Sequence, residues 1–482
     1  MYLLILCRSN KIVFLMRFIS LFFARFFARF FDKNFKSFNS LKNKREVIAW
    51  SFYDFANQPF TTIIITFVYS AYFVDYVCPP DVNGIALWSM GISITAIIVS
   101  ILSPILGAIA DRGGFRKFFL IISTWVCIVA TACLFFFQKG DHIVALVYLI
   151  IANVGFEIGT VICNSYLPEL ASKKNIGRIS GFAWGLGFIG GLISLVIILS
   201  AVFLLPLILV DSVNVTEKVI RSSNIVVAIW LAIFSIPVFF LVKEKRTETL
   251  TNKHIKDSIS SIFKTFRTIK KYKIIVRFLF ARLFYNDALI TIFALGGVYA
   301  MQALDFSYIE ILILGVVLNV CAAIGSFVFG RIEDKIGPRK TIEWSILILI
   351  IAVQLAYLSP EFSEYGISKS LFWIAGVLIG FMTGPSQSCS RSLMARLTPE
   401  DKTNEFFGFY AFTGKATSFL GPFLFGILVY NFSPQAGLLA VLGLFIIGYF
   451  LFQTVYMDKI NKKLILENSI LFLIIIFELI YL

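Results

Sequence analysis

Long apolar segments alternate with short polar connections along nearly the whole chain of 482 residues. A helix that crosses a membrane needs roughly 20 apolar residues, because the hydrocarbon core is about 30 Å thick. Lipid offers the backbone no hydrogen-bond partners, so each such segment is expected to be a helix. The pattern predicts an all-α integral membrane protein with twelve transmembrane helices. These spans are expected at 50–77, 84–109, 117–137, 143–168, 178–206, 222–242, 275–302, 307–331, 341–358, 369–396, 405–431 and 435–456.

The basic residues lie mainly on one side of these spans. Of the 43 Lys and Arg residues, 36 fall on the side that holds both ends of the twelve-helix core and 4 on the other side. Three more lie within spans, namely Arg277, Arg282 and Lys415. Because Lys and Arg concentrate in cytosolic loops, both ends of the core are expected in the cytosol.

The longest internal connection, residues 243–274, divides the spans six and six. We expect an N-terminal six-helix half (46–242), a basic cytosolic linker (243–274) and a C-terminal six-helix half (275–456). A basic, aromatic extension precedes them (1–45), and a hydrophobic tail follows them (457–482).

The two ends each allow two interpretations. The stretch "FFARFFARFF" within residues 1–31 suits an amphipathic helix at the membrane surface, or an upstream extension if translation begins at Met16. The stretch "LILENSILFLIIIFELIYL" (464–482) is long enough for a thirteenth span, or it lies on the membrane surface.

Composition excludes several classes of protein. The chain is 59% hydrophobic and only 15% charged, more apolar surface than a soluble protein of this length could bury. The net charge of +15 follows from topology, so membrane lipid rather than nucleic acid is the expected partner. The seven cysteines form no C-x-x-C pair and the two histidines, His142 and His254, lie in loops, so we expect no metal site and no cofactor.

The halves share a loop motif. "GAIADRGGFRK" follows the second span and "GRIEDKIGPRK" follows the eighth, and both read G-x-x-x-D-[RK]-x-G-x-R-K. Glycine allows close helix packing, the Asp is expected to cap the next helix or pair with a basic residue, and the Arg–Lys pair to bind helix carbonyls or anionic lipid. The motif residues are Gly107, Asp111, Arg112, Gly114, Arg116 and Lys117, and Gly330, Asp334, Lys335, Gly337, Arg339 and Lys340.

Two weaker similarities follow the same order along the chain. "GFAWGLG" from Gly181 matches "GFYAFTG" from Gly408, and "FYDFAN" (52–57) matches "FYNDAL" (284–289). Parallel repeats of this kind imply a pseudo-twofold axis along the membrane normal, with a substrate path between the halves.

Together with the central loop and the doubled motif, several stretches resemble the major facilitator superfamily, and within it the vacuole-effluxer branch. They are "SFYDFANQPF", "RISGFAWGLGFIGG", "ARLFYNDALITIFALGGVYA" and "SRSLMARLTPEDKTNEFFGFYAFTGKATSFLGP". The resemblance covers about 46–456. It implies a monomeric secondary transporter of a small polar solute by alternating access; the branch includes a fungal exporter of vacuolar amino acids and many bacterial members.

Polar residues within the first span are candidates for the transport path. Asp54, Asn57, Gln58 and Thr61 lie on one helical face, next to Tyr53, and Pro59 weakens the backbone ladder behind them. Either Asp54 caps the first turn of the span in the headgroup region, or this face is a cavity wall or gate.

Span 7 repeats this chemistry with Tyr285, Asn286 and Asp287. Arg282 is expected to pair with Asp287 or Asp54. Gly296–Gly297 offers a break in this helix near the midplane.

Spans 4 and 11 contribute ionisable groups near mid-membrane. Glu157 and Asn164 share one face of span 4, and Lys415 of span 11 is expected to face the cavity rather than snorkel. Glu157 and Lys415 come from opposite halves and are expected to pair when no substrate is bound. Glu157 and Asp287 are the candidates for proton coupling.

Span 10 carries Gln387 as a further cavity candidate. Arg391 and Arg396 are expected to anchor the span at the cytosolic interface. A further set, Gly376, Gly380 and Gly384, forms a stripe for close helix packing.

A secondary transporter of an amino acid or related metabolite accounts for all of these features. The alternative is an integral-membrane enzyme, such as a lipid or glycan transferase. No H-E-x-x-H, D-x-D or Gly-rich phosphate loop supports it, so we expect no enzyme activity. The expected location is a bacterial plasma membrane, with a vacuolar or other organelle membrane as the alternative.

Overall fold

The computed structural model describes residues 43–113, 115–208, 215–244 and 269–456, and these residues form helices joined by turns. The N-terminal half contains α2 (Lys44–Pro59), a π-helical stretch (Phe60–Phe67), α3 (Tyr69–Tyr72), a second π-helical stretch (Phe73–Val77), α4 (Gly84–Gly113), α5 (Arg116–Cys133), α6 (His142–Ser165), α7 (Leu167–Leu170), α8 (Ile176–Ile208) and α9 (Val215–Leu241). The C-terminal half contains α11 (Lys273–Leu304), α12 (Tyr308–Ile336), α13 (Pro338–Leu358), α14 (Ser368–Leu397), α15 (Thr403–Lys415), α16 (Leu420–Asn431) and α17 (Pro434–Gln453).

Twelve segments correspond to the twelve predicted spans. Eleven of them are long and apolar enough to cross a membrane. The twelfth, α14, has 30 residues but is polar in its second half, "PSQSCSRS". Its serines are fully buried, so protein rather than lipid surrounds this polar stretch. The fold is therefore the expected twelve-helix bundle in two halves; residues 1–42, most of the linker and the tail with its suggested thirteenth span lie outside the described residues.

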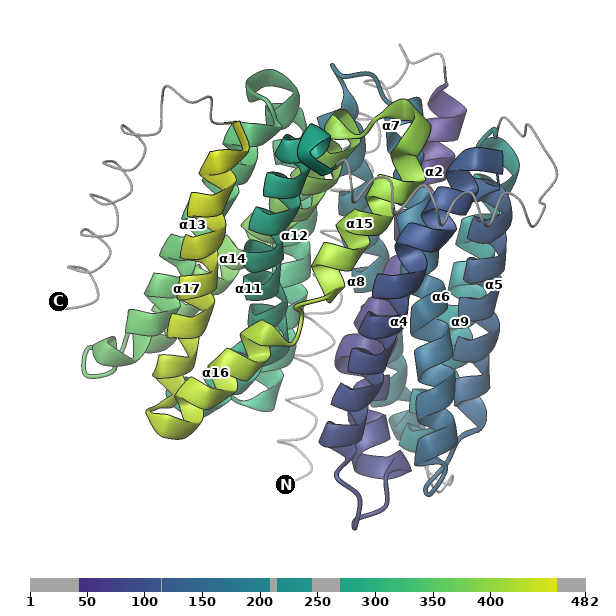
Figure 1. The fold of residues 1–482 in the computed structure, drawn as a ribbon. Helices are drawn as coiled ribbons and strands as arrows, with labels where there is room; N and C mark the ends of the chain where they lie inside the picture. Colours follow the sequence, from purple (N-terminus) through teal and green to yellow (C-terminus); the bar gives the residue numbers. More distant parts are fainter. Residues whose placement is uncertain (1–42, 114, 209–214, 245–268, 457–482) are drawn as a thin grey trace.

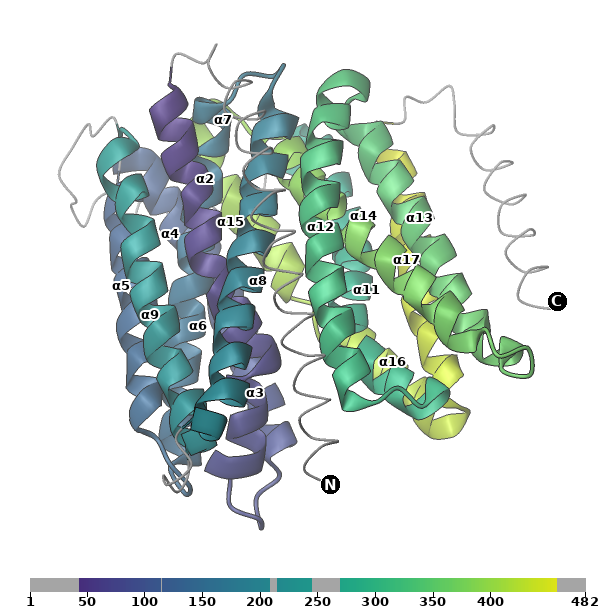
Figure 2. The same cartoon turned by 180° about the vertical axis from the view of Figure 1, so that it is seen from behind.

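The two halves stand side by side (Figures 1 and 2). Both ends of the twelve-helix core lie at the same end of the bundle, together with both loop motifs. We call this the motif end; it is the end expected to be cytosolic. Two helix pairs join the halves there: α15 lies along α4, and α8 lies along α12.

Glycines allow these two pairs to approach closely. A Cβ atom on Gly408 of α15 would lie 2.6 Å from Pro104 of α4. A Cβ atom on Gly181 of α8 would lie 2.9 Å from Gly330 of α12. Gly181 and Gly408 are the residues paired by the weaker sequence repeat, so the repeat places equivalent contacts on both sides of the pseudo-twofold axis.

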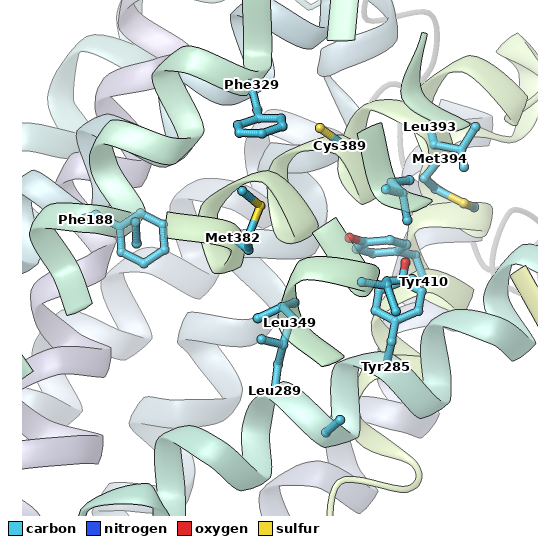
Figure 3. Close-up of a cluster of buried hydrophobic side chains, with 14 of the residues drawn as sticks. Phe188, Tyr285, Leu289, Phe329, Leu349, Met382, Cys389, Leu393, Met394 and Tyr410 are labelled. Atoms are coloured by element: carbon cyan, nitrogen blue, oxygen red, sulfur yellow. The ribbon is translucent and has the colours of Figure 1, made fainter. Parts of the chain in front are cut away.

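Hydrophobic packing also differs along the bundle. One buried cluster runs through both halves, and a second is formed mainly by the N-terminal half away from the motif end. In the C-terminal half, this first cluster includes buried side chains of α14. Figure 3 shows Met382, Cys389 and Leu393 of α14 together with Tyr285 and Leu289 of α11. The stripe of Gly376, Gly380 and Gly384 packs against α12, as expected.

The first span begins earlier than predicted. Helix α2 starts at Lys44 with Asn43 as its N-cap residue, so Asp54 lies near the end of its third turn. The interpretation of Asp54 as a helix cap is therefore wrong, because its side chain is too far from the unpaired N–H groups of the first turn.

Pro59 lacks an N–H group, so the carbonyl of Phe55 loses its helical partner. The indole of Trp230 on α9 donates a hydrogen bond to that carbonyl at 3.1 Å. The backbone beyond Pro59 continues as a π-helix from Phe60 to Phe67. The proline therefore changes the winding of the span without leaving a buried carbonyl unpaired.

The predicted break in span 7 is wrong. Helix α11 continues through Gly296 and Gly297, because glycine permits a break without forcing one. The break lies instead in span 11, where residues 416–419 form turns between α15 and α16. Pro422 in the first turn of α16 cannot donate to the carbonyl of Ser418, which favours an interruption here.

Candidate transport site

Arg391 of α14 lies between the halves with 2% of its side chain exposed. Its Nη1 donates to Asp54 Oδ2 of α2 at 2.7 Å and to Asn164 Oδ1 of α6 at 3.0 Å. Its Nε and Nη2 donate to the hydroxyl and the carbonyl of Ser180 on α8, at 3.0 and 2.8 Å. All of these acceptors belong to the N-terminal half. We call these four residues the Arg391 cluster.

Two tryptophans of the N-terminal half complete the surroundings of this guanidinium. Its carbon lies 4.9 Å from the ring centre of Trp50 and 5.5 Å from that of Trp184, within the range of cation–π attraction. The expectation that Arg391 anchors the span at the interface is thus wrong: it is buried, and it is the counter-ion of Asp54. Arg396, one turn later, lies at the motif end and pairs with Glu333 of α12 at 3.3 Å.

A second ion pair crosses between the halves nearer mid-membrane. Lys415 Nζ at the end of α15 lies 2.6 Å from Glu157 Oε1 of α6, which confirms the expected pairing. The side chains are 32% and 15% exposed. Because both residues lie near the middle of their spans, the pair lies deeper in the bundle than the Arg391 cluster.

Asn286 and Gln387 form hydrogen bonds between helices of the C-terminal half, next to this ion pair. Gln387 of α14 donates to the side-chain oxygen of Asn286 on α11 at 3.0 Å. Asn286 in turn donates to the carbonyl of Gly414, the residue before Lys415, at 3.5 Å. These amides therefore connect three helices at the point where α15 ends.

The remaining polar candidates of span 1 face their own half. The Tyr53 hydroxyl lies 2.9 Å from that of Thr124 on α5, and the Asn57 amide donates to Thr160 on α6 at 3.4 Å. Gln58 is partly buried beside Gly191 of α8.

Tyr285 of span 7, the counterpart of Tyr53, also forms a contact within its own half. The Tyr285 hydroxyl of α11 lies 2.7 Å from that of Ser390 on α14, and Tyr285 is 1% exposed. The two tyrosines thus hold helices together inside each half.

Arg282 does not form the predicted pair with Asp54 or Asp287. Its Nη1 donates to the carbonyl of Tyr410 on α15 at 3.0 Å, and its guanidinium carbon lies 3.7 Å from the centre of that ring. Asp287 is fully buried, and no hydrogen bond of regular geometry reaches either of its carboxylate oxygens within the described chain.

The two Asp residues of the loop motifs act across the halves. Asp111 accepts from the backbone N–H groups of Asn404 and Glu405 at 2.9 and 2.8 Å, at the start of α15. Asp334 accepts from those of Gly177 and Arg178 at 2.9 and 3.2 Å, at the start of α8. Each carboxylate thus caps the positive end of a helix of the other half rather than the next helix along the chain. Asp334 also pairs with a basic residue, Arg396 of α14, at 3.7 Å.

Other motif residues hold the loops at this end. Arg116 pairs with Glu169, and Lys117 Nζ donates to the carbonyl of Val242 at 2.9 Å. The Glu244 carboxylate accepts from the Lys117 N–H at 3.2 Å, while burial raises the pKa of Glu244.

The second motif differs in detail. Gly337 has φ of 88°, a conformation that favours glycine. Arg339 pairs with Glu343 at 2.8 Å, and Lys335 and Lys340 are exposed. Gly107 packs against Asn404 as a close contact, whereas the Arg112 side chain and Gly114 lie outside the described part.

Sequence reasoning missed Ser180, Trp50 and Trp184 as partners of Arg391. A signal was available: Arg391 is flanked by serines and follows a glycine stripe, which suits a helix enclosed by protein rather than lipid. Which residues would enclose it depends on how the halves dock.

Comparison with known proteins fits this architecture. The family model described as "Vacuole effluxer Atg22 like" matches residues 71–464. The uncharacterized MFS-type transporter YxiO of Bacillus subtilis is 27% identical over 83% of this chain and 92% of its own length. Autophagy-related protein 22 of Pichia angusta is 22% identical over 72% of this chain and 70% of its own length.

Solved structures share the fold. The human organic anion transporter MFSD10 superposes with a TM-score of 0.63 at 14% identity, covering 86% of this chain and all of its own. The proton:xylose symporter XylE of the major facilitator superfamily gives 0.63 at 14% identity, covering 85% of this chain and 95% of its own.

Proposed function

We propose, from the premise that this chain belongs to the vacuole effluxer (Atg22-like) family of membrane transporters, that it moves a small zwitterionic solute by alternating access. An amino acid or a related metabolite is the solute class. Relatives that are named transporters, and the shared major facilitator fold, support transport as such. The class of solute rests on the charges between the halves.

The observation that carries the proposal is the Lys415–Glu157 ion pair. It joins opposite halves, lies near mid-membrane and remains partly exposed. A zwitterion offers a carboxylate for Lys415 and an ammonium for Glu157, so it can replace both partners of the pair at once. Charged groups at membrane depth are costly, and each would keep a counter-charge when solute binds.

The mechanism we propose is rocking of the two halves about this pair. In the described chain, contacts between the halves include the Arg391 cluster, the two Asp caps and the Ser165–Asn404 hydrogen bond at the motif end, and the Lys415–Glu157 pair at mid-bundle. The motif end is therefore closed in this structure. Opening it requires Arg391 to leave Asp54, while solute bound at Lys415 and Glu157 stays between the halves.

A proton is the coupling ion that we propose, with Glu157 and Asp287 as the candidate carriers. The protein would act as a monomer in a membrane of a bacterial cell, with an organelle membrane as the alternative, and with the motif end cytosolic. The basic loops at that end support the orientation.

Solute counterflow in proteoliposomes tests the proposal. The liposomes are loaded with unlabelled solute, and a panel of radiolabelled amino acids and nucleosides is offered outside. We expect exchange of at least one amino acid without chemical change. Lys415→Met and Glu157→Gln should each lower its rate by about tenfold or more, because one charge-assisted contact contributes about 1.5–3 kcal/mol.

The matched control is Lys369→Met. Lys369 also pairs with a glutamate, Glu310, at 3.1 Å, but at the end of the bundle opposite the motif end. Solute exchange by the Lys369→Met variant should stay at the wild-type rate. Absence of exchange for every solute of the panel would contradict the proposal, and chemical conversion of a solute would favour a membrane enzyme instead.

A further inference from the structure

Several buried polar atoms without a hydrogen bond of regular geometry gather opposite the break in span 11. They are both carboxylate oxygens of Asp287, the hydroxyl of Thr417 and Nε of Arg282. Buried polar atoms are usually paired, so such a group asks for an explanation. Asp287 is the most demanding of them, because a carboxylate excluded from solvent is costly when ionised and unpaired.

The break itself lies against Asp287. A Cβ atom on Gly421, in the first turn of α16, would be 3.0 Å from the Asp287 carbonyl. That carbonyl already accepts from Thr291 at 2.7 Å. The Thr417 hydroxyl, within the break, is close to the Asp287 carboxylate, although no hydrogen bond of regular geometry joins them.

The charges around Asp287 are few. Within the described residues, Arg282 is the charged group that acts on it, and its guanidinium is held by the carbonyl and ring of Tyr410 on α15. Lys415, the last residue of α15 before the break, is directed to Glu157 of the other half.

Helices α14 and α17, which also pack against α11, add no further charge at this point. Helix α14 presents neutral polar groups, Gln387 and Ser390, to the neighbouring Asn286 and Tyr285. Helix α17 presents Leu444 beside Gly421 and Gly448 beside Tyr285.

We propose that Asp287 binds the coupling ion, that this ion is a proton, and that the break in span 11 controls access to it. The inference rests on the proposed transport function and chooses Asp287 over Glu157, whose negative charge Lys415 already balances. A bound proton neutralises the carboxylate and lets it donate to Thr417. A metal cation suits the site less well, because the Arg282 guanidinium would repel it.

The same break connects the proton to the solute. Lys415 and Thr417 lie two residues apart, one directed to the N-terminal half and the other to Asp287. A solute that separates Lys415 from Glu157 frees the end of α15 to move against α16. That movement opens Asp287 to water, and the proton leaves or enters there.

Infrared spectroscopy of the purified full chain in lipid nanodiscs tests the protonation without any solute. We expect the carbonyl stretch of a buried protonated carboxyl group at pH 7, its loss in Asp287→Asn and its retention in Glu157→Gln. Thr417→Val keeps the carboxyl group of Asp287 and should shift its band. This variant therefore tests the assignment even if Asp287→Asn does not fold. A band that persists unshifted in both Asp287→Asn and Thr417→Val would overturn the proposal.

Transport supplies the second readout. Accumulation of the radiolabelled amino acid that exchanges in wild-type liposomes should depend on a pH gradient, and in Asp287→Asn it should lose that dependence. If wild-type protein exchanges no amino acid, the proposed function fails while the infrared result still decides the proton site. A pH-dependent accumulation that survives in Asp287→Asn would show that the proton binds elsewhere.

Discussion

At the scale of single residues, buried polar groups in this protein are held by partners that are distant in sequence. The Phe55 carbonyl, which Pro59 leaves unpaired, accepts a hydrogen bond from Trp230, 175 residues later. Asp54 is neutralised by Arg391 from the other half. Sequence reasoning identified Asp54, Glu157 and Lys415 as unusual for their depth. It predicted the partner correctly for Glu157 and Lys415, but for Asp54 it proposed Arg282 instead of Arg391.

Replacing Trp230 by Phe should destabilise the protein by about 1 kcal/mol, because the Phe55 carbonyl then lacks a donor. In a Pro59→Ala background the cost should shrink, since residue 59 regains an N–H group for that carbonyl. Equilibrium unfolding in detergent of the two single variants and the double variant measures the coupling. An equal cost of Trp230→Phe in both backgrounds would show that the indole acts only by packing.

At the scale of helices, the sequence predicted where each span lies far better than how it is wound. The alternation of apolar segments with polar connections located all twelve, because a span needs roughly 20 mainly apolar residues whatever its neighbours are; α14 meets this least well. The alternation could not predict the π-helical part of span 1, the unbroken α11 or the turns between α15 and α16. The first and the last of these depend on which side chain or neighbouring helix takes up the backbone groups that Pro59 and Pro422 leave unpaired.

Close helix crossings should be sensitive to one added methyl group. Gly181→Ala places a Cβ atom against α12, and Gly408→Ala places one against α4. Each should cost about 1–3 kcal/mol of stability through overpacking. Thermal unfolding of the detergent-solubilised variants provides the measurement.

Gly426→Ala on α16 is the matched control for these two variants. No heavy atom lies within 4 Å of an added Cβ atom at Gly426. Alanine also favours a helix by about 1 kcal/mol over glycine. Stability should therefore stay the same or rise, and a loss as large as that of Gly181→Ala would mean that the crossings are not the cause.

At the scale of the whole molecule, two pseudo-symmetric six-helix halves pack against each other at the motif end. The repeat predicted the pseudo-twofold arrangement, and the structure shows that the motif carboxylates Asp111 and Asp334 act reciprocally on helices of the opposite half. The sequence could not show which end is closed, because that depends on the docking of the halves. Breaking a buried ion pair costs about 3–5 kcal/mol, so the Arg391 cluster is expected to contribute most to closure.

Arg391→Ala should therefore shift the protein toward a state that is open at the motif end. Spin labels at positions 174 and 335, both exposed at that end and in opposite halves, report the separation in a background without accessible cysteines. Arg391→Lys keeps one charge but not the four hydrogen bonds, so we expect a smaller shift. Lys369→Met is the control without an expected shift.

Pulsed electron–electron distance measurement on this labelled pair tests the central claim, that the two halves move against each other about contacts broken and formed in transport. We expect a single short separation in the wild-type protein and a second, longer population in Arg391→Ala. The same single distribution in wild type, Arg391→Ala and Lys369→Met would contradict a movement of the halves controlled by Arg391.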